Sequence, residues 1–138
     1  MTDEVTIKSS RSDYELRLSE AKPYGQKASV EYIRVSINGH DLTASSSKVY
    51  IYEPYHLAKF FEDLAAKWKG WEGEKAWNSI EEDFSIVATT DRLGHIALKI
   101  ELRSGPYDED WAIEARIYID AGQIEEIARS VKRFLHIQ

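Results

Sequence analysis

Histidines are the side chains in this sequence best suited to proton transfer or metal binding. The chain has four of them, His40, His56, His95 and His136, and their spacing matches no metal motif such as HExxH. His95 ends the segment Asp91-Arg92-Leu93-Gly94-His95, and we expect it to bond within the turn that Asp91 begins. The absence of cysteine removes any thiolate ligand, disulfide or thiol nucleophile. We therefore expect neither a metal nor another cofactor.

A pair of carboxylates would be the other route to acid–base chemistry. Glu101 and Glu114 lie on neighbouring predicted strands and face each other in one of two possible registers. An enzyme would use His95 together with one of these glutamates. The chain contains no GxSxG, P-loop or GxGxxG motif, and its glycines are too dispersed to cradle a phosphate. We therefore predict that the protein is not an enzyme.

Three antiparallel strands followed by a helix, from Glu81 to His136, must position these residues. Apolar and polar residues alternate in three runs between 83 and 119, which is typical of strands with one buried face. Asp120 and Gln123 resemble a capping box that begins the helix at 121–136.

The register of the last two strands follows from their charges. Pairing Leu102 with Trp111 places Lys99 opposite Glu114, whereas a slip of two residues places Glu101 opposite Glu114. Because like charges directly opposite are unfavourable, we predict the first register.

The first half of the chain contains the signals of short strands and one helix. Asn38-Gly39 predicts a two-residue hairpin turn that pairs Ile37 with His40. We expect the serines at 45–47 to interrupt the following strand. Pro54 suits the first turn of a helix. Apolar residues then recur every three or four positions, as on one face of a helix, and Gly70 follows the end of that helix.

These elements predict an α+β fold in a single domain, residues 1–138. We expect one antiparallel, curled sheet of six or seven strands, with two helices packed on one face. The predicted segments are N-terminal strands 4–52, helix 54–68, a tryptophan-rich loop 69–80, a three-strand meander 83–119 and helix 121–136.

Acidic residues should gather at one end of the meander. In this topology the start of the first strand and the loop after the second lie together, which brings together Glu81, Glu82, Asp83, Asp108, Glu109 and Asp110. Residues 70–138 hold fourteen acids and eight bases, which accounts for the whole net charge of −6. Such a surface repels nucleic acid and favours a protein partner with a basic surface.

Residues 68–78, WKGWEGEKAWN, hold three of the four tryptophans. Trp71 and Trp77 would serve as apolar anchors for a partner, as a platform for a carbohydrate or other small molecule, or as a cover for the core. We take the protein-binding module as the leading hypothesis and the small-molecule or carbohydrate-binding protein as the alternative. The N-terminus lacks a signal-peptide pattern and no apolar run would span a membrane, so we expect a cytoplasmic protein that does not bind membranes.

The chain from about residue 55 to 136 resembles a bacterial family of uncharacterised small proteins. The resemblance rests on the G-W-x-G segment at Gly70–Gly73 and on the D-x-x-G-H turn at Asp91–His95. The order of elements and this turn are also similar to those of WapI-type immunity proteins, which bind and neutralise toxin domains. That second resemblance implies an immunity-like protein that neutralises a basic toxin domain, and neither resemblance implies a catalytic residue.

Overall fold

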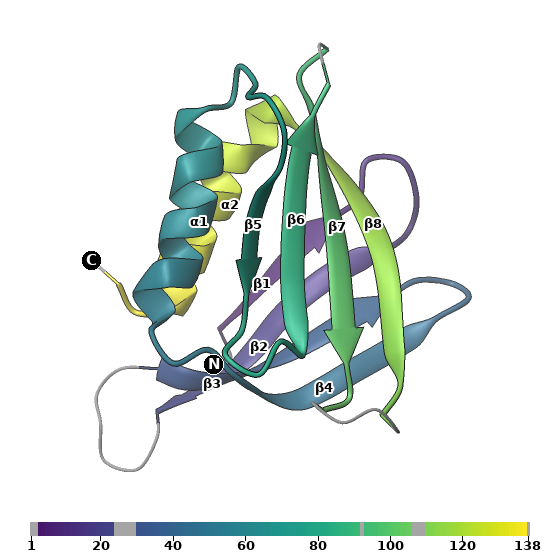
Figure 1. Ribbon diagram of the computed structural model, residues 1–138, viewed down its shortest axis with the longest axis vertical. Helices are drawn as coiled ribbons and strands as arrows, with labels where there is room; N and C mark the ends of the chain where they lie inside the picture. Colours follow the sequence, from purple (N-terminus) through teal and green to yellow (C-terminus); the bar gives the residue numbers. More distant parts are fainter. Residues whose placement is uncertain (1–2, 24–29, 92, 106–109, 138) are drawn as a thin grey trace.

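The computed structural model describes residues 3–23, 30–91, 93–105 and 110–137, which form two four-stranded antiparallel sheets and two helices (Figure 1). The first sheet has the order β1-β2-β3-β4 and the second has the order β5-β6-β7-β8. The strands are β1 (Glu4–Lys8), β2 (Glu15–Pro23), β3 (Val30–Asn38), β4 (Thr43–Tyr50), β5 (Lys75–Asn78), β6 (Phe84–Thr90), β7 (His95–Arg103) and β8 (Ala112–Asp120). The helices are α1 (Pro54–Ala66) and α2 (Ala121–Phe134).

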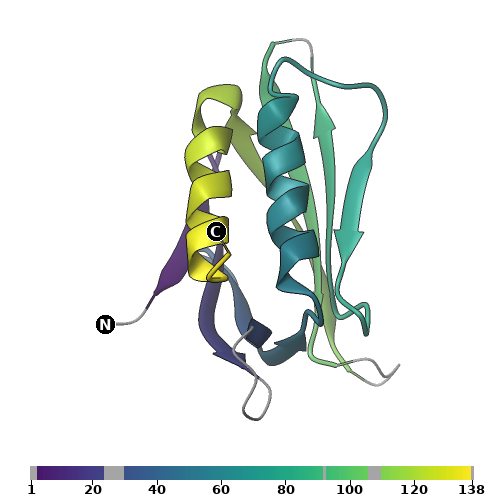
Figure 2. The same cartoon turned by 90° about the vertical axis from the view of Figure 1, so that its left-hand side faces the viewer.

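Alternating apolar residues place one core between the two sheets and the helices. On β7 the even-numbered residues from Ile96 to Leu102 are fully buried, while the odd-numbered ones are partly exposed. Leu57, Phe61 and Leu64 of α1 join the same buried cluster. The two helices lie side by side: α1 lies alongside β5 of the second sheet, and α2 contacts both β1 of the first sheet and β8 of the second. The opposite face of the second sheet has no helix over it (Figures 1 and 2).

The α+β class is confirmed, but the prediction of one curled sheet of six or seven strands is wrong. Eight strands form two separate sheets. The segment that follows the edge strand β1 is bonded to the edge strand β8, because Ser10 N donates to Tyr118 O at 2.7 Å and Tyr118 N donates to Ser9 Oγ at 3.2 Å. Strand twist accumulates across a sheet, and β1 is only five residues long. β1 and β8 do not pair as neighbouring strands, and the two sheets stay separate.

Two local features differ from the predicted strands, and the second of them adds a strand. The serines at 45–47 do not interrupt the strand but lie within β4, where the register shift opposite Ile33 and Val35 of β3 accommodates one extra residue in β4. The predicted tryptophan-rich loop contains β5, whose Trp77 lies opposite Ile86 of β6. The glycines of that segment lie before β5 and do not prevent pairing.

The turn between β3 and β4 is longer than Asn38-Gly39 predicts. Ile37 pairs with Ala44 rather than with His40, and Gly39 N donates to Leu42 O at 2.8 Å. A carboxylate from another hairpin holds this turn, because Asp13 accepts hydrogen bonds from both the backbone N–H and the ring of His40. This long-range contact replaces the local turn preference.

The register of β7 and β8 is the slipped one, so the predicted register is wrong. Leu102 lies opposite Ile113, and Glu101 lies opposite Glu114. In this register Ile119 pairs with Ile96 and is fully buried, whereas the predicted register would set it opposite Gly94, outside β7. Burial of one isoleucine stabilises a fold by about 1.5–3 kcal/mol. A like-charged exposed pair costs roughly 0.2–1 kcal/mol, so burial dominates.

Both helices form near their predicted positions. α1 starts at Pro54, and α2 starts after Asp120, whose backbone N–H donates to Gln123 Oε1 at 2.8 Å as in the return half of a capping box. Each helix ends about two residues earlier than predicted. Within the described ranges, neither helix has the length and apolar character that crossing a membrane requires.

Candidate functional site: the open face of the second sheet

The uncovered face of the second sheet, which we call the open face, carries a furrow with a floor of small side chains. Three hollows of about 420, 160 and 240 Å³ follow one another along it. The first two share Val87, and the last two share Thr89 and Ala97. Solvent-facing strand positions commonly carry long polar side chains, so small residues on β6 and β7 leave room for a ligand or for side chains of a partner.

The largest hollow lies at the end of the sheet where β6 begins, which we call the acidic end. Glu81 and Glu82 are exposed, and both line the hollow together with Glu101 and Arg103. Glu101 pairs with Arg103 at 3.6 Å. No side chain in the described part of the structure pairs with the carboxylates of Glu81 and Glu82, so their charges are available to a partner.

The other acidic residues proposed for a partner differ in their roles. Asp83 is 5% exposed, and its Oδ1 accepts a hydrogen bond from Ser79 Oγ at 2.6 Å. Its backbone carbonyl accepts from Arg103 N at 2.8 Å, so Asp83 serves the fold and offers little exposed surface to a partner. Asp110 lies at the same end, beside Gly105. Asp108 and Glu109 lie outside the described residues.

The two tryptophans proposed as anchors both pack on the core. The Trp77 ring meets Phe84 edge-on with centroids 5.4 Å apart. Trp71 is partly buried and its Nε1 is inaccessible to solvent and without a hydrogen-bond partner. This packing favours the interpretation that they cover the core, although Trp77 also lines the largest hollow.

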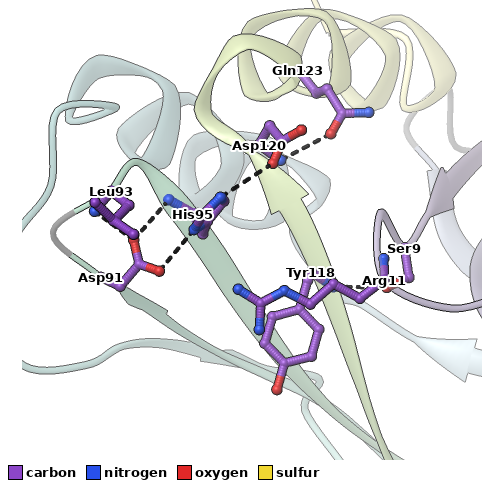
Figure 3. A network of polar contacts seen from close by, with 8 residues as sticks. All are labelled: Ser9, Arg11, Asp91, Leu93, His95, Tyr118, Asp120 and Gln123. Atoms are coloured by element: carbon purple, nitrogen blue, oxygen red, sulfur yellow. Dashed lines mark hydrogen bonds and ion pairs between the residues drawn. The ribbon is translucent and has the colours of Figure 1, made fainter.

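His95 lies at the opposite end of the furrow, within a network of polar contacts (Figure 3). Asp91 Oδ1 accepts hydrogen bonds from the backbone N–H groups of Leu93 and His95, and Oδ2 lies 2.8 Å from His95 Nδ1. These bonds to His95 and Leu93 lower the pKa of Asp91 from 3.8 to about 2. Asp120 lies 3.9 Å from His95 Nε2. His95 therefore bonds the turn that Asp91 begins, as the sequence predicts.

The arrangement that acid–base chemistry with His95 would need is not formed by the described side chains. Glu101 and Glu114 do lie opposite each other, but Arg103 pairs with the first and Arg116 with the second, at 3.6 and 3.4 Å. Six residues of strand separate His95 from Glu101, a distance of roughly 20 Å. The described part of the chain also contains no group of three or more His, Asp or Glu side chains placed to hold a metal ion.

Three exposed hydrophobic side chains near the acidic end were missed by the sequence analysis. Tyr52 and Tyr55 are each 54% exposed, and Ile80, which directly precedes Glu81, is 57% exposed. Ile80 N donates to Tyr50 O at 3.4 Å, so the segment that carries the acids contacts the end of β4. The available signal was three tyrosines within the six residues from Tyr50 to Tyr55.

A family model places the chain among known sequences. The model, described as "Family of unknown function (DUF6228)", matches residues 7–138. The chain belongs to this family. Comparison with curated proteins and with solved structures finds no significant match.

Membership in DUF6228 agrees with the predicted resemblance to an uncharacterised family and extends it. The match includes most of the first sheet as well as the segment from residue 55 onwards. A family of unknown function brings no catalytic residue, ligand or partner to the chain. Its function must therefore be argued from the surface itself.

Proposed function

We propose that this protein is a non-enzymatic, cytoplasmic protein-binding module that docks a basic protein surface on its acidic end. The observation that carries the proposal is the pair Glu81 and Glu82. These exposed carboxylates have no partner side chain in the described structure, and they border a hollow of about 420 Å³ on a sheet face that no helix covers. Free charge beside an open concave surface favours association with an oppositely charged partner.

The distribution of charge supports the same partner. The half of the chain that contains the open face carries the entire net charge of −6. Acidic residues at the rim of an interface mainly accelerate association, and buried apolar contacts mainly slow dissociation. The similarity of the order of elements to WapI-type immunity proteins suggests a basic toxin domain as the partner.

Affinity capture with matched variants tests this proposal. The wild-type protein, a Glu81→Lys/Glu82→Lys variant and an Asp3→Lys/Glu72→Lys variant are immobilised and exposed to one cell extract at about 50 and about 500 mM salt. The two variants change net charge equally, but Asp3 and Glu72 line none of the three hollows on the open face. We expect a basic protein to be retained by the wild type and by the Asp3/Glu72 variant at low salt, and to be lost from the Glu81/Glu82 variant. Equal retention by all three proteins would contradict the proposal.

A small-molecule or carbohydrate-binding function is the second candidate. It is favoured by the mixed lining of the largest hollow, where Asn78, Glu101 and Arg103 offer hydrogen-bonding groups beside Trp77. A thermal-shift screen with mono- and oligosaccharides would detect such a ligand. A stabilising sugar whose effect disappears in Arg103→Ala, but persists in Arg129→Ala on α2, would support this candidate.

A further inference from the structure

We propose that an arginine side chain of the docked partner binds to one exposed surface, here called the tyrosine patch. The patch consists of the exposed side chains of Tyr52, Tyr55 and Ile80 and the neighbouring ring of Tyr50. This inference rests on the proposed function and names the contact that supplies its affinity. The patch takes the role of apolar anchor that the sequence analysis assigned to Trp71 and Trp77.

Exposure distinguishes the tyrosine patch from the tryptophans. Only six large hydrophobic side chains are classed as exposed in the described structure, and three of them are Tyr52, Tyr55 and Ile80. Contiguous exposed apolar surface on a folded protein commonly marks an interaction site, and tyrosine is enriched among the residues that dominate binding energy. The patch is therefore better suited to contact a partner than rings that pack on the core.

Two of the patch rings, Tyr50 and Tyr52, are in contact with each other. Tyr50 and Tyr52 stack with centroids 6.1 Å apart and an interplanar angle of 29°. Tyr32 meets Tyr50 edge-on at 4.9 Å. Stacked rings present a broad aromatic surface that loses little conformational freedom when a partner binds, because each tyrosine has only two side-chain torsions.

The rings of this region already accept cations. Lys48 Nζ lies 4.6 Å from the centroid of Tyr32, and Lys59 Nζ lies 5.9 Å from the centroid of Tyr55. A positive group over an aromatic face is attracted by the ring quadrupole, and arginine does this more often than lysine because its planar guanidinium also stacks. The exposed side of Tyr52 offers a similar position to a cation from outside.

Acidic residues directly follow two members of the patch in the sequence and favour a positively charged partner. Glu81 and Glu82 follow Ile80 directly, and Glu53 follows Tyr52. Glu53 also lies 3.2 Å from His56, so it is partly engaged. The positive charges of Lys48 and Lys59 oppose this negative charge, but each lysine already lies over a ring, Tyr32 and Tyr55 respectively. An arginine on the patch would gain ring contact and carboxylate contact together, which a neutral side chain would not.

The backbone is also held in an unusual conformation at one residue of the patch and at one residue of the acidic end. Tyr52 has φ 57° and Glu82 has φ 59°, values in the left-handed region that favours glycine. Residues kept in such conformations concentrate at functional sites. The conformations of Tyr52 and Glu82 are therefore consistent with a docking role.

Two synthetic peptides test the inference. One alternates glycine with arginine, the other alternates glycine with lysine, and both have equal length and charge. Binding to the wild type, to Tyr52→Leu/Tyr55→Leu and to Glu81→Lys/Glu82→Lys is measured by titration calorimetry. Leucine keeps apolar area but removes the aromatic face. Thermal unfolding confirms that each variant folds, and Tyr52→Leu alone replaces the double variant if that one does not.

We expect the wild type to bind the arginine peptide about two- to fivefold more tightly than the lysine peptide for each ring engaged. The leucine variant should bind both peptides equally, and the Glu81/Glu82 variant should lose both. If the wild type binds both peptides equally, or if the leucine variant keeps the arginine preference, the tyrosine patch is not the arginine site. In either case, loss of binding in the Glu81/Glu82 variant would still support the acidic end as the docking surface. If neither peptide binds the wild type, the proposed function and this inference both fail.

Discussion

Replacement of Ser79 by alanine should destabilise the protein strongly, although Ser79 lies beside the exposed acidic end. Ser79 is 1% exposed. Its hydroxyl donates to Asp83 Oδ1 at 2.6 Å and accepts from Phe84 N at 3.1 Å. The Ser79→Ala substitution removes both bonds and leaves a buried carboxylate and a buried N–H without these partners.

The size of the effect follows from the two bonds. A hydrogen bond to a charged group contributes about 1.5–3 kcal/mol, and a neutral one about 0.5–1.5 kcal/mol. We therefore expect Ser79→Ala to lower the free energy of unfolding by about 2–4 kcal/mol. For a domain of this size such a loss corresponds to a Tm lower by roughly 8–15 °C.

Urea unfolding followed by far-UV circular dichroism measures this difference. Ser104→Ala is the matched control, because Ser104 also accepts a backbone hydrogen bond at the same end of the sheet but is exposed. The control should lose less than about 1 kcal/mol. A loss of similar size in both variants would refute the reasoning, since it would mean that burial of Ser79 and Asp83 does not increase the contribution of their hydrogen bonds to stability.

Three further predictions concern the turns and the register. A Cβ atom on Gly39 would lie 2.4 Å from ring carbons of Tyr14, so Gly39→Ala should cost about 1–3 kcal/mol of unfolding free energy in urea titrations, and clearly less in a Tyr14→Ala background. Because the pKa of Asp91 falls from 3.8 to about 2 in the folded protein, its stabilising effect is complete above about pH 5 and is lost as pH falls through about 2. The Tm difference between wild type and Asp91→Asn should therefore shrink between about pH 5 and pH 2, and a constant difference would contradict the assignment. NMR should show a cross-strand Hα–Hα contact between Glu101 and Glu114, which face each other, and a contact between Lys99 and Glu114 instead would restore the predicted register.

Local sequence patterns predicted most elements of this fold because those elements depend on local periodicity. The alternation on β6, β7 and β8, the helix after Pro54 and the capping residues Asp120 and Gln123 all appear near their predicted positions. The turn of Asp91 and His95 was predicted for the same reason, since its bonds join residues at most four positions apart.

Features that depend on distant contacts were not predictable in this way. The turn after Asn38 is held by Asp13, and the division into two sheets depends on how β1 meets β8. In the register of β7 and β8, the charge rule was given more weight than the burial of Ile119. At the candidate site, Glu81 and Glu82 are exposed as expected, but the buried state of Asp83 depends on Ser79 and Arg103. The tyrosine patch forms only when the segment after β5 contacts the end of β4.

An NMR titration of the isotope-labelled protein with the glycine–arginine peptide tests the central claim most directly. The account predicts that the largest backbone shift changes fall on Tyr52, Glu53 and the segment from Ile80 to Glu82. Leu93 and His95, at the opposite end of the furrow, should change little, because the Asp91 carboxylate there is already bonded to both residues. Shift changes that centre on His95, or that scatter evenly over both sheets, would contradict the assignment of the acidic end and the tyrosine patch as the docking surface.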